Sequence, residues 1–142
     1  MDKILIGSDH GGYNLKNTLI EYLKEKNFEV VDVGTYSKDS CDYPVIAKKL
    51  CSEITLGTAK NGILVCGSGV GMSIVANKQK GIRAVVCSDT YSAKMSKRHN
   101  NTNILCLGER VVGADLAKDI LDSWLSAEFE GERHLKRVEM YE

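Results

Sequence analysis

Cys66 begins the stretch of the sequence that most suggests chemistry, Cys66-Gly67-Ser68-Gly69-Val70-Gly71. The stretch follows an apolar run and leads into a helical pattern near Ser73, so its backbone N–H groups would gather at a positively polarised helix end. Such a nest of N–H groups binds an anion, or an oxyanion that develops during a reaction. A helix N-terminus also stabilises a thiolate, which makes Cys66 a candidate base or nucleophile.

Two other interpretations of this loop stay open. The glycines could serve only a tight turn. The spacing also resembles the G-x-G-x-x-G loop of dinucleotide sites, with Asp89 at the end of the next strand. That pattern is incomplete, because Met72 occupies the third glycine position and the loop follows the third apolar run rather than the first. The rival from another functional class is therefore a non-catalytic nucleotide-binding or thiol-sensing domain.

Further candidate residues lie elsewhere in the chain. A second Gly-rich strand exit, residues 7–12, contains Asp9 and His10. His99 begins a polar run where no core requires it, and histidine changes charge near neutral pH, which suits acid–base work. Arg133 and Arg137 are four residues apart, so on a helix they would share one face and could bind one phosphate. From spacing alone, a solvated charged face explains these two arginines more simply.

The elements that must position these residues alternate along the chain. Short apolar runs without polar alternation suit strands buried on both faces; they cover residues 4–7, 28–33, 62–66, 82–87 and 104–107. Helical spacing fills the intervals, and Asp89 can cap one of these helices. The pattern predicts one α/β domain over residues 1–142, a three-layer α/β/α, Rossmann-like fold with a five-stranded parallel sheet. Functional groups should gather where the strands end.

Composition excludes several classes of protein. The chain of 142 residues has 19 Lys+Arg and 19 Asp+Glu, so no overall charge would hold nucleic acid or an anionic membrane. No apolar run approaches the roughly 18 residues that span a bilayer, and we expect a cytoplasmic protein. The five cysteines are odd in number and contain no C-x-x-C pair, which argues against a disulfide framework and a structural zinc site.

Six motifs in order cover nearly the whole chain: Gly7-Ser8-Asp9-His10-Gly11-Gly12, Asp42-Tyr43-Pro44, Cys66-Gly67-Ser68-Gly69-Val70-Gly71, Gly81-Ile82-Arg83-Ala84, Arg98-His99-Asn100 and Glu130-Gly131-Glu132-Arg133-His134. Together they resemble the type B ribose-5-phosphate isomerases, of the sugar-phosphate isomerase family that includes galactose-6-phosphate isomerase. The resemblance implies interconversion of ribose 5-phosphate and ribulose 5-phosphate without a metal or cofactor. A hexose 6-phosphate, such as allose or galactose 6-phosphate, stays an alternative substrate because the sequence does not show the length of the pocket.

The resemblance also implies a role for each matching position. Cys66 would be the base that moves a proton between C1 and C2, and His99 would help to open the furanose ring. The nest would stabilise the enediolate, with help from the Ser68 hydroxyl; its residues are Gly67, Ser68, Gly69, Val70 and Gly71. The other substrate contacts implied are Asp9, His10, Asn100, Arg110, Arg133 and Arg137. Some members carry a glutamate base where this chain has Met72, so Cys66 is the one candidate base in the loop.

The predicted topology separates these residues into two groups. Cys66, Asp9, His10 and Arg110 follow strands, whereas His99 and Asn100 precede one and should lie at the opposite edge of the sheet. A helix of about ten residues spans about 15 Å, so one chain cannot easily join the groups. We therefore expect a homodimer with two shared active sites, or a dimer of such dimers. The C-terminal helical segment, about 127–142, would then pack on the partner chain.

Overall fold

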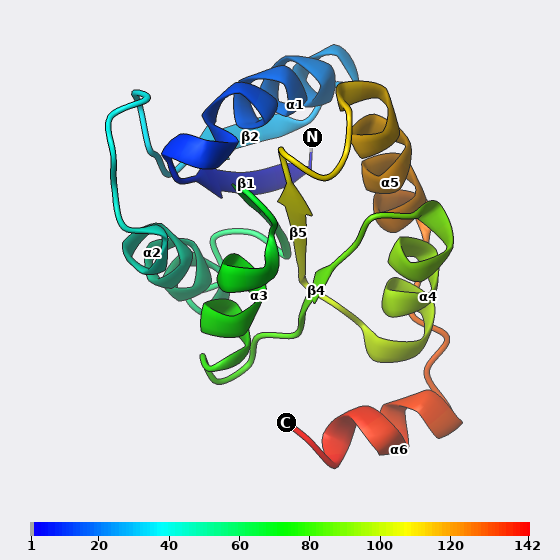
Figure 1. The fold of residues 1–142 in the computed structure, drawn as a ribbon. Helices are drawn as coiled ribbons and strands as arrows, with labels where there is room; N and C mark the ends of the chain where they lie inside the picture. Colours follow the sequence, from blue (N-terminus) through cyan, green and yellow to red (C-terminus); the bar gives the residue numbers. More distant parts are fainter. Residues whose placement is uncertain (1) are drawn as a thin grey trace.

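The computed structural model describes residues 2–142, in which strands and helices alternate as expected (Figure 1). The strands are β1 (Lys3–Ser8), β2 (Glu29–Asp32), β3 (Asn61–Cys66), β4 (Ala84–Val86) and β5 (Ile104–Gly108). The helices are α1 (Tyr13–Glu25), α2 (Tyr43–Thr55), α3 (Val70–Asn77), α4 (Thr90–Asn100), α5 (Ala114–Ser126) and α6 (Arg133–Glu139), with a short 3₁₀ turn at His10–Gly12 before α1.

The five strands form one parallel sheet in the order β2-β1-β3-β5-β4, which confirms the predicted fold class. The register pairs Ser8 with Val65 and Cys66 with Gly108. The ends of β1, β3 and β5 therefore meet at one edge of the sheet. The loops that carry the candidate residues leave from that edge.

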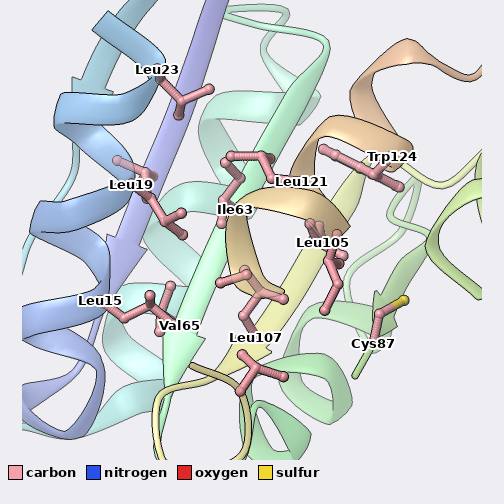
Figure 2. Packing of buried hydrophobic residues seen from close by; sticks show 14 of the residues in the cluster. Leu15, Leu19, Leu23, Ile63, Val65, Cys87, Leu105, Leu107, Leu121 and Trp124 are labelled. Carbon is pink, nitrogen blue, oxygen red and sulfur yellow. The ribbon is translucent and has the colours of Figure 1, made fainter. Parts of the chain in front are cut away.

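Two apolar clusters cover the two faces of the sheet and make the three layers. On one face, leucines of α1 and α5 pack on β3 and β5 (Figure 2), and the labelled residues include Leu15, Leu19, Leu23, Ile63, Val65, Leu105, Leu107, Leu121 and Trp124. On the other face, α2 and α3 pack through Ile46, Leu50 and Met72. Burial on both faces explains why the strand sequences are apolar without alternation.

Local signals in the sequence account for several helix ends. Asp89 Oδ1 accepts a hydrogen bond of 2.7 Å from Ser92 N at the start of α4, and Pro44 lies in the first turn of α2. Strand β4 is shorter than the apolar run 82–87, because it pairs only with β5 at the edge of the sheet. His99 and Asn100 belong to the last turn of α4, directly before the loop that leads to β5.

The C-terminal helix α6 stands away from the three layers and meets the body of the protein near the end of α4 (Figure 1). His134 and Val138 supply its buried positions. Arg133 and Arg137 are both on this helix and both exposed. Among the described residues, no helix is long and apolar enough to cross a membrane.

Candidate active site

The first group of candidate residues comes together where β1 and β3 end. Asp9 is 8% exposed; its backbone N donates to Val65 O at 3.2 Å, and its Oδ1 accepts from Gly12 N at 3.1 Å. The loop of Asp9 touches the loop of Cys66 closely, because a Cβ added to Gly11 would lie 3.3 Å from Gly67 N. The two Gly-rich strand exits therefore form one site.

Cys66 lies under the N-terminus of α3 and is 5% exposed. Its Sγ accepts a hydrogen bond from Gly69 N at 3.1 Å. A donor of this kind stabilises negative charge on sulfur, as the positive end of a helix does. Met72, at the position where a glutamate base would stand, is completely buried in the core, so this residue does not reach the site.

Gly69 must be glycine for two separate reasons. Its φ of +81° is in the left-handed region, and a Cβ would lie 2.9 Å from both Leu107 C and Val86 Cγ2. The first condition disfavours any side chain, and the second leaves no room for one. The backbone that carries the N–H donor is therefore held in a conformation that only glycine adopts without strain.

Three other thiols, Cys51, Cys87 and Cys106, also lie in the core. Burial raises the pKa of Cys51 to about 11 and that of Cys87 to about 12. Burial also raises the pKa of Cys106 well above its usual value. These groups stay protonated at neutral pH. Cys87 and Cys106 are core residues, with exposures of 3% and 0%.

Cationic and polar residues lie on the loops at this edge of the sheet. Arg110 N donates to Gly67 O at 3.0 Å, and the Arg110 guanidinium lies beside Gly67, since a Cβ there would be 3.4 Å from Nη1. His10 is exposed, and its Nδ1 accepts from Cys41 N at 3.2 Å. The Ser68 side chain is exposed, and its Oγ accepts from Val70 N at 3.2 Å.

Two residues that shape this site were not predicted as part of it. The Tyr43 ring covers Gly71 so closely that a Cβ there would lie 2.8 Å from the ring. Tyr43 belongs to the motif Asp42-Tyr43-Pro44, so the family resemblance could have identified it as a site residue. Glu109 Oε1 accepts from Leu15 N at 2.7 Å and joins the end of β5 to the start of α1. No local pattern marks Glu109, because its partner is 94 residues away.

The second group of candidate residues lies at the opposite edge of the sheet. Asn100 Nδ2 donates to Tyr141 OH at 3.3 Å, and Asn100 lines a cavity of about 400 Å³ beside Ala84, where β4 begins. His99 precedes Asn100 in the last turn of α4. That helix has 11 residues and is therefore about 16 Å long, so it carries both side chains away from the strand ends. Within one chain, the two groups are not brought together.

His99 also has packing partners that the polar sequence around it concealed. Its ring stacks on the His134 ring, with centroids 4.2 Å apart and planes 9° from parallel. Its Nε2 lies 3.8 Å from Glu130 Oε2. The His99 side chain is 41% exposed and belongs to neither apolar cluster, so its packing on His134 lies outside the core.

A thiol lies beneath backbone N–H donors where the strands of a parallel sheet end. This arrangement suits proton transfer next to a carbonyl. The class of protein that the fold and the site define is an aldose–ketose isomerase. The chain belongs to the ribose/galactose isomerase family, whose model matches residues 4–141.

Individual relatives agree with this assignment. The chain is 52% identical over 139 residues to ribose-5-phosphate isomerase B of Escherichia coli (strain K12). The aligned region covers 98% of this chain and 93% of the relative. It is 46% identical to the D-erythrulose-4-phosphate isomerase of Pectobacterium atrosepticum, with 98% and 92% of the two chains covered. The solved structure of ribose-5-phosphate isomerase B from Clostridium thermocellum superposes with a TM-score of 0.96 at 54% sequence identity. The superposition covers 97% of this chain and 93% of the solved one.

Family membership favours the enzyme over the nucleotide-binding alternative. The names of the two sequence relatives refer to sugars of different length. The choice of sugar therefore needs its own experiment.

Proposed function

We propose that this enzyme interconverts ribose 5-phosphate and ribulose 5-phosphate, with Cys66 as the base. The contact that carries the proposal is the 3.1 Å hydrogen bond from Gly69 N to Cys66 Sγ at the start of α3. It supports a thiolate in the buried position from which a proton next to a carbonyl could be taken. The 52% identity to a ribose-5-phosphate isomerase B supports the choice of sugar.

Ring opening is the first step, and His99 carries it out. The ring oxygen of the furanose must gain a proton while the anomeric hydroxyl loses one, which exposes the C1 aldehyde. A histidine suits this exchange because both its protonated and neutral forms are accessible near neutral pH. Asp9 and Ser68 contact the hydroxyl groups of the open chain.

Proton transfer between C2 and C1 is the second step. The Cys66 thiolate takes the proton from C2, and the electron pair of that bond forms the C1–C2 double bond of an enediolate, with negative charge on the C1 oxygen. The Cys66 thiol returns the proton to C1, while the proton of the C2 hydroxyl passes to the C1 oxygen. The product is the ketose, and no atom is gained or lost.

The loop from Gly67 to Gly71 lowers the barrier to this step. Backbone N–H donors already aimed at a developing oxyanion contribute about 3–4 kcal/mol each to the transition state. The first amides of α3 have no partner within the helix; that of Val70 donates to Ser68 Oγ at 3.2 Å, and that of Gly71 can face a ligand. We therefore propose that the reaction proceeds without a metal or cofactor.

Each active site is shared by two chains of a homodimer. Cys66 and Arg110 lie at one edge of the sheet, whereas His99 and α6 lie at the other. Large apolar side chains are exposed along α3 and near α4, as a dimer interface requires; they include Val70 at 48%, Ile74 at 54%, Val86 at 40% and Tyr91 at 70%. The segment 127–142 would then bring Arg133 and Arg137 to the phosphate in the partner's site, opposite His10 and Arg110.

The state of the cysteines supports a cytoplasmic location for this enzyme. All five are free thiols, and four of them are buried. Proteins of oxidising compartments more often pair their cysteines in disulfides.

A panel of aldose phosphates, assayed for ketose formation with and without a chelator, tests the proposal. We expect turnover of ribose 5-phosphate that the chelator leaves unchanged, and its loss in Cys66→Ala. The matched control is Cys41→Ala, which removes a half-buried thiol from a neighbouring loop and should keep activity. Preference for a hexose 6-phosphate or a tetrose 4-phosphate would contradict the proposed substrate, and loss of turnover in the chelator would contradict the metal-free reaction.

A further inference from the structure

His134 is almost fully buried although its imidazole has no hydrogen-bond partner at Nε2. It is one of only two described residues with a buried side-chain N or O atom left without such a partner. A buried polar atom without a hydrogen bond costs free energy, so a reason other than stability is needed for histidine at this position.

The one aromatic neighbour that the structure records for His134 is His99. The two rings lie 4.2 Å apart and 9° from parallel, although they come from helices 35 positions apart in sequence. The His99 side chain is 41% exposed, whereas that of His134 is 9% exposed. The buried His134 ring therefore packs against one face of the more exposed His99 ring.

Glu130 lies beside both rings and is fixed in place. Its Oε2 accepts from Arg98 Nε at 2.6 Å, and its backbone N donates to Arg98 O at 3.0 Å. The carboxylate oxygens lie 3.8 Å from His99 Nε2 and 3.4 Å from His134 Nε2. The carboxylate therefore places a negative charge beside both rings.

The surroundings of His134 and Glu130 shift the pKa of each group in a definite direction. Burial lowers the pKa of His134, and positive charge on His99, Arg133 and Arg137 lowers it further. Burial alone would raise the pKa of Glu130, but the hydrogen bond and charge of Arg98 keep it below its usual value. At neutral pH His134 is therefore neutral and Glu130 is ionised. The Glu130 carboxylate therefore presents a negative charge to the exposed His99 ring.

We propose that His134 is a positioning residue for ring opening, which holds the His99 ring by stacking while the Glu130 carboxylate lies beside the same ring. The inference rests on the role of His99 in the proposed function. It assigns a purpose to the buried histidine without making it contact the sugar. The charged groups around the stacked pair are Arg98 on α4, Glu130 before α6, and Arg133 and Arg137 on α6.

A metal ion is the other use for two histidines and a carboxylate whose ligand atoms lie within 4.8 Å of one another. The ring planes argue against it. A histidine nitrogen binds metal in the plane of its ring, and planes 9° from parallel direct the two nitrogens alongside each other rather than toward one point. Arg98 also occupies the carboxylate oxygen nearest to His99.

Two rates measured on the full enzyme distinguish a positioning role of His134 from a general loss of folded structure. Turnover of ribose 5-phosphate needs ring opening, whereas exchange of the C1 hydrogens of ribulose 5-phosphate with deuterium from D₂O needs only proton transfer by Cys66. The variants are His134→Leu, which removes the stack, and His134→Phe, which keeps it. Glu130→Gln removes the anion, and its matched control is Glu139→Gln on the exposed face of α6.

We expect His134→Leu to lower turnover about three- to tenfold while exchange stays within about twofold of the unaltered enzyme, and His134→Phe to recover most of the turnover. Glu130→Gln should also lower turnover more than exchange, because the amide removes the negative charge that lies beside the His99 ring. Glu139→Gln should leave both rates unchanged.

Equal losses of turnover and exchange in His134→Leu or in Glu130→Gln would overturn the positioning role. Turnover that needs added Zn²⁺ and is lost in Glu130→Gln would overturn it in favour of a metal site. His99→Asn distinguishes this failure from that of the proposed function. Suppose that His99→Asn loses turnover but keeps exchange, whereas the His134 variants lose both rates equally. Only the inference about His134 then fails. If His99→Asn loses both rates equally, the ring-opening role of His99 fails as well.

Discussion

Replacing Gly69 by alanine perturbs the catalytic loop at the residue whose N–H contacts Cys66 Sγ. A side chain at a φ of +81° costs about 1–2 kcal/mol, since the left-handed region places Cβ against the following carbonyl. The added methyl group would also lie 2.9 Å from Leu107 C and Val86 Cγ2, and overpacking of this kind costs about 1–3 kcal/mol. We therefore expect Gly69→Ala to lower the free energy of unfolding by about 2–5 kcal/mol.

For a domain of 142 residues, 1 kcal/mol corresponds to about 3 °C in Tm, so thermal unfolding should begin about 6–15 °C lower. The matched control is Gly57→Ala, where φ is +86° but no atom lies within 4 Å of the added Cβ. This variant incurs the backbone cost alone and should lose only about 3–6 °C.

Activity at 20 °C, where both variants are folded, supplies the second readout. Displacing one preorganised N–H donor lowers kcat by about 10²-fold, so Gly69→Ala should lose turnover and Gly57→Ala should keep it. If Gly69→Ala were no less stable than Gly57→Ala and equally active, the proposal that this loop positions the thiolate would be refuted.

Three further predictions concern stability, thiol reactivity and phosphate binding. Asp32→Asn should lower the free energy of unfolding by about 3–5 kcal/mol in urea titrations, because it leaves the wholly buried Lys16 ammonium without its carboxylate at 2.9 Å. Iodoacetamide at pH 8 should modify Cys66 in mass spectra and leave Cys87 unmodified, since a pKa raised to about 12 keeps that thiol protonated. Arg137→Ala should raise KM for ribose 5-phosphate about tenfold and change kcat less, as measured in steady-state assays.

Each of these predictions has its own control. Glu29→Gln breaks the exposed ion pair with Lys3, whose atoms lie 3.8 Å apart, and should lower the free energy of unfolding by less than about 1 kcal/mol. An equally small loss in Asp32→Asn would contradict the stabilising role of the Lys16–Asp32 pair. Ribose 5-phosphate should protect Cys66 from modification, and labelling of Cys87 at the same rate would contradict its burial. Lys136→Ala should leave KM unchanged, whereas a KM effect as large as that of Arg137→Ala would indicate a general effect of charge on α6.

Strands and loops of this fold were predictable from the sequence because their signals are local. Apolar runs mark strands buried on both faces, and the strands they predicted form the observed sheet. The glycines around Cys66 were informative because a left-handed backbone and a close approach leave few alternatives. The length of β4 was not predictable, since it depends on which strand lies at the edge of the sheet.

Contacts between distant segments could not be predicted in the same way. The stack of His99 on His134 depends on where the chain after α5 returns to the end of α4, and no residue pattern encodes that path. Lys16 is wholly buried although lysine is rarely found inside, because Asp32 and the carbonyl oxygen of Thr35 meet it across 16 and 19 residues. Such pairs become visible only when the tertiary structure is known.

The central claim is that two chains complete each active site, and mixed dimers test it most directly. Cys66→Ala and His99→Asn chains, each inactive alone, are mixed in equal amounts under conditions where mass spectrometry shows that subunits exchange. Half of the dimers then hold one chain of each kind, and each mixed dimer has one intact site, so turnover of ribose 5-phosphate should recover to about a quarter of the unaltered value. No recovery, with exchange complete, would contradict the shared site.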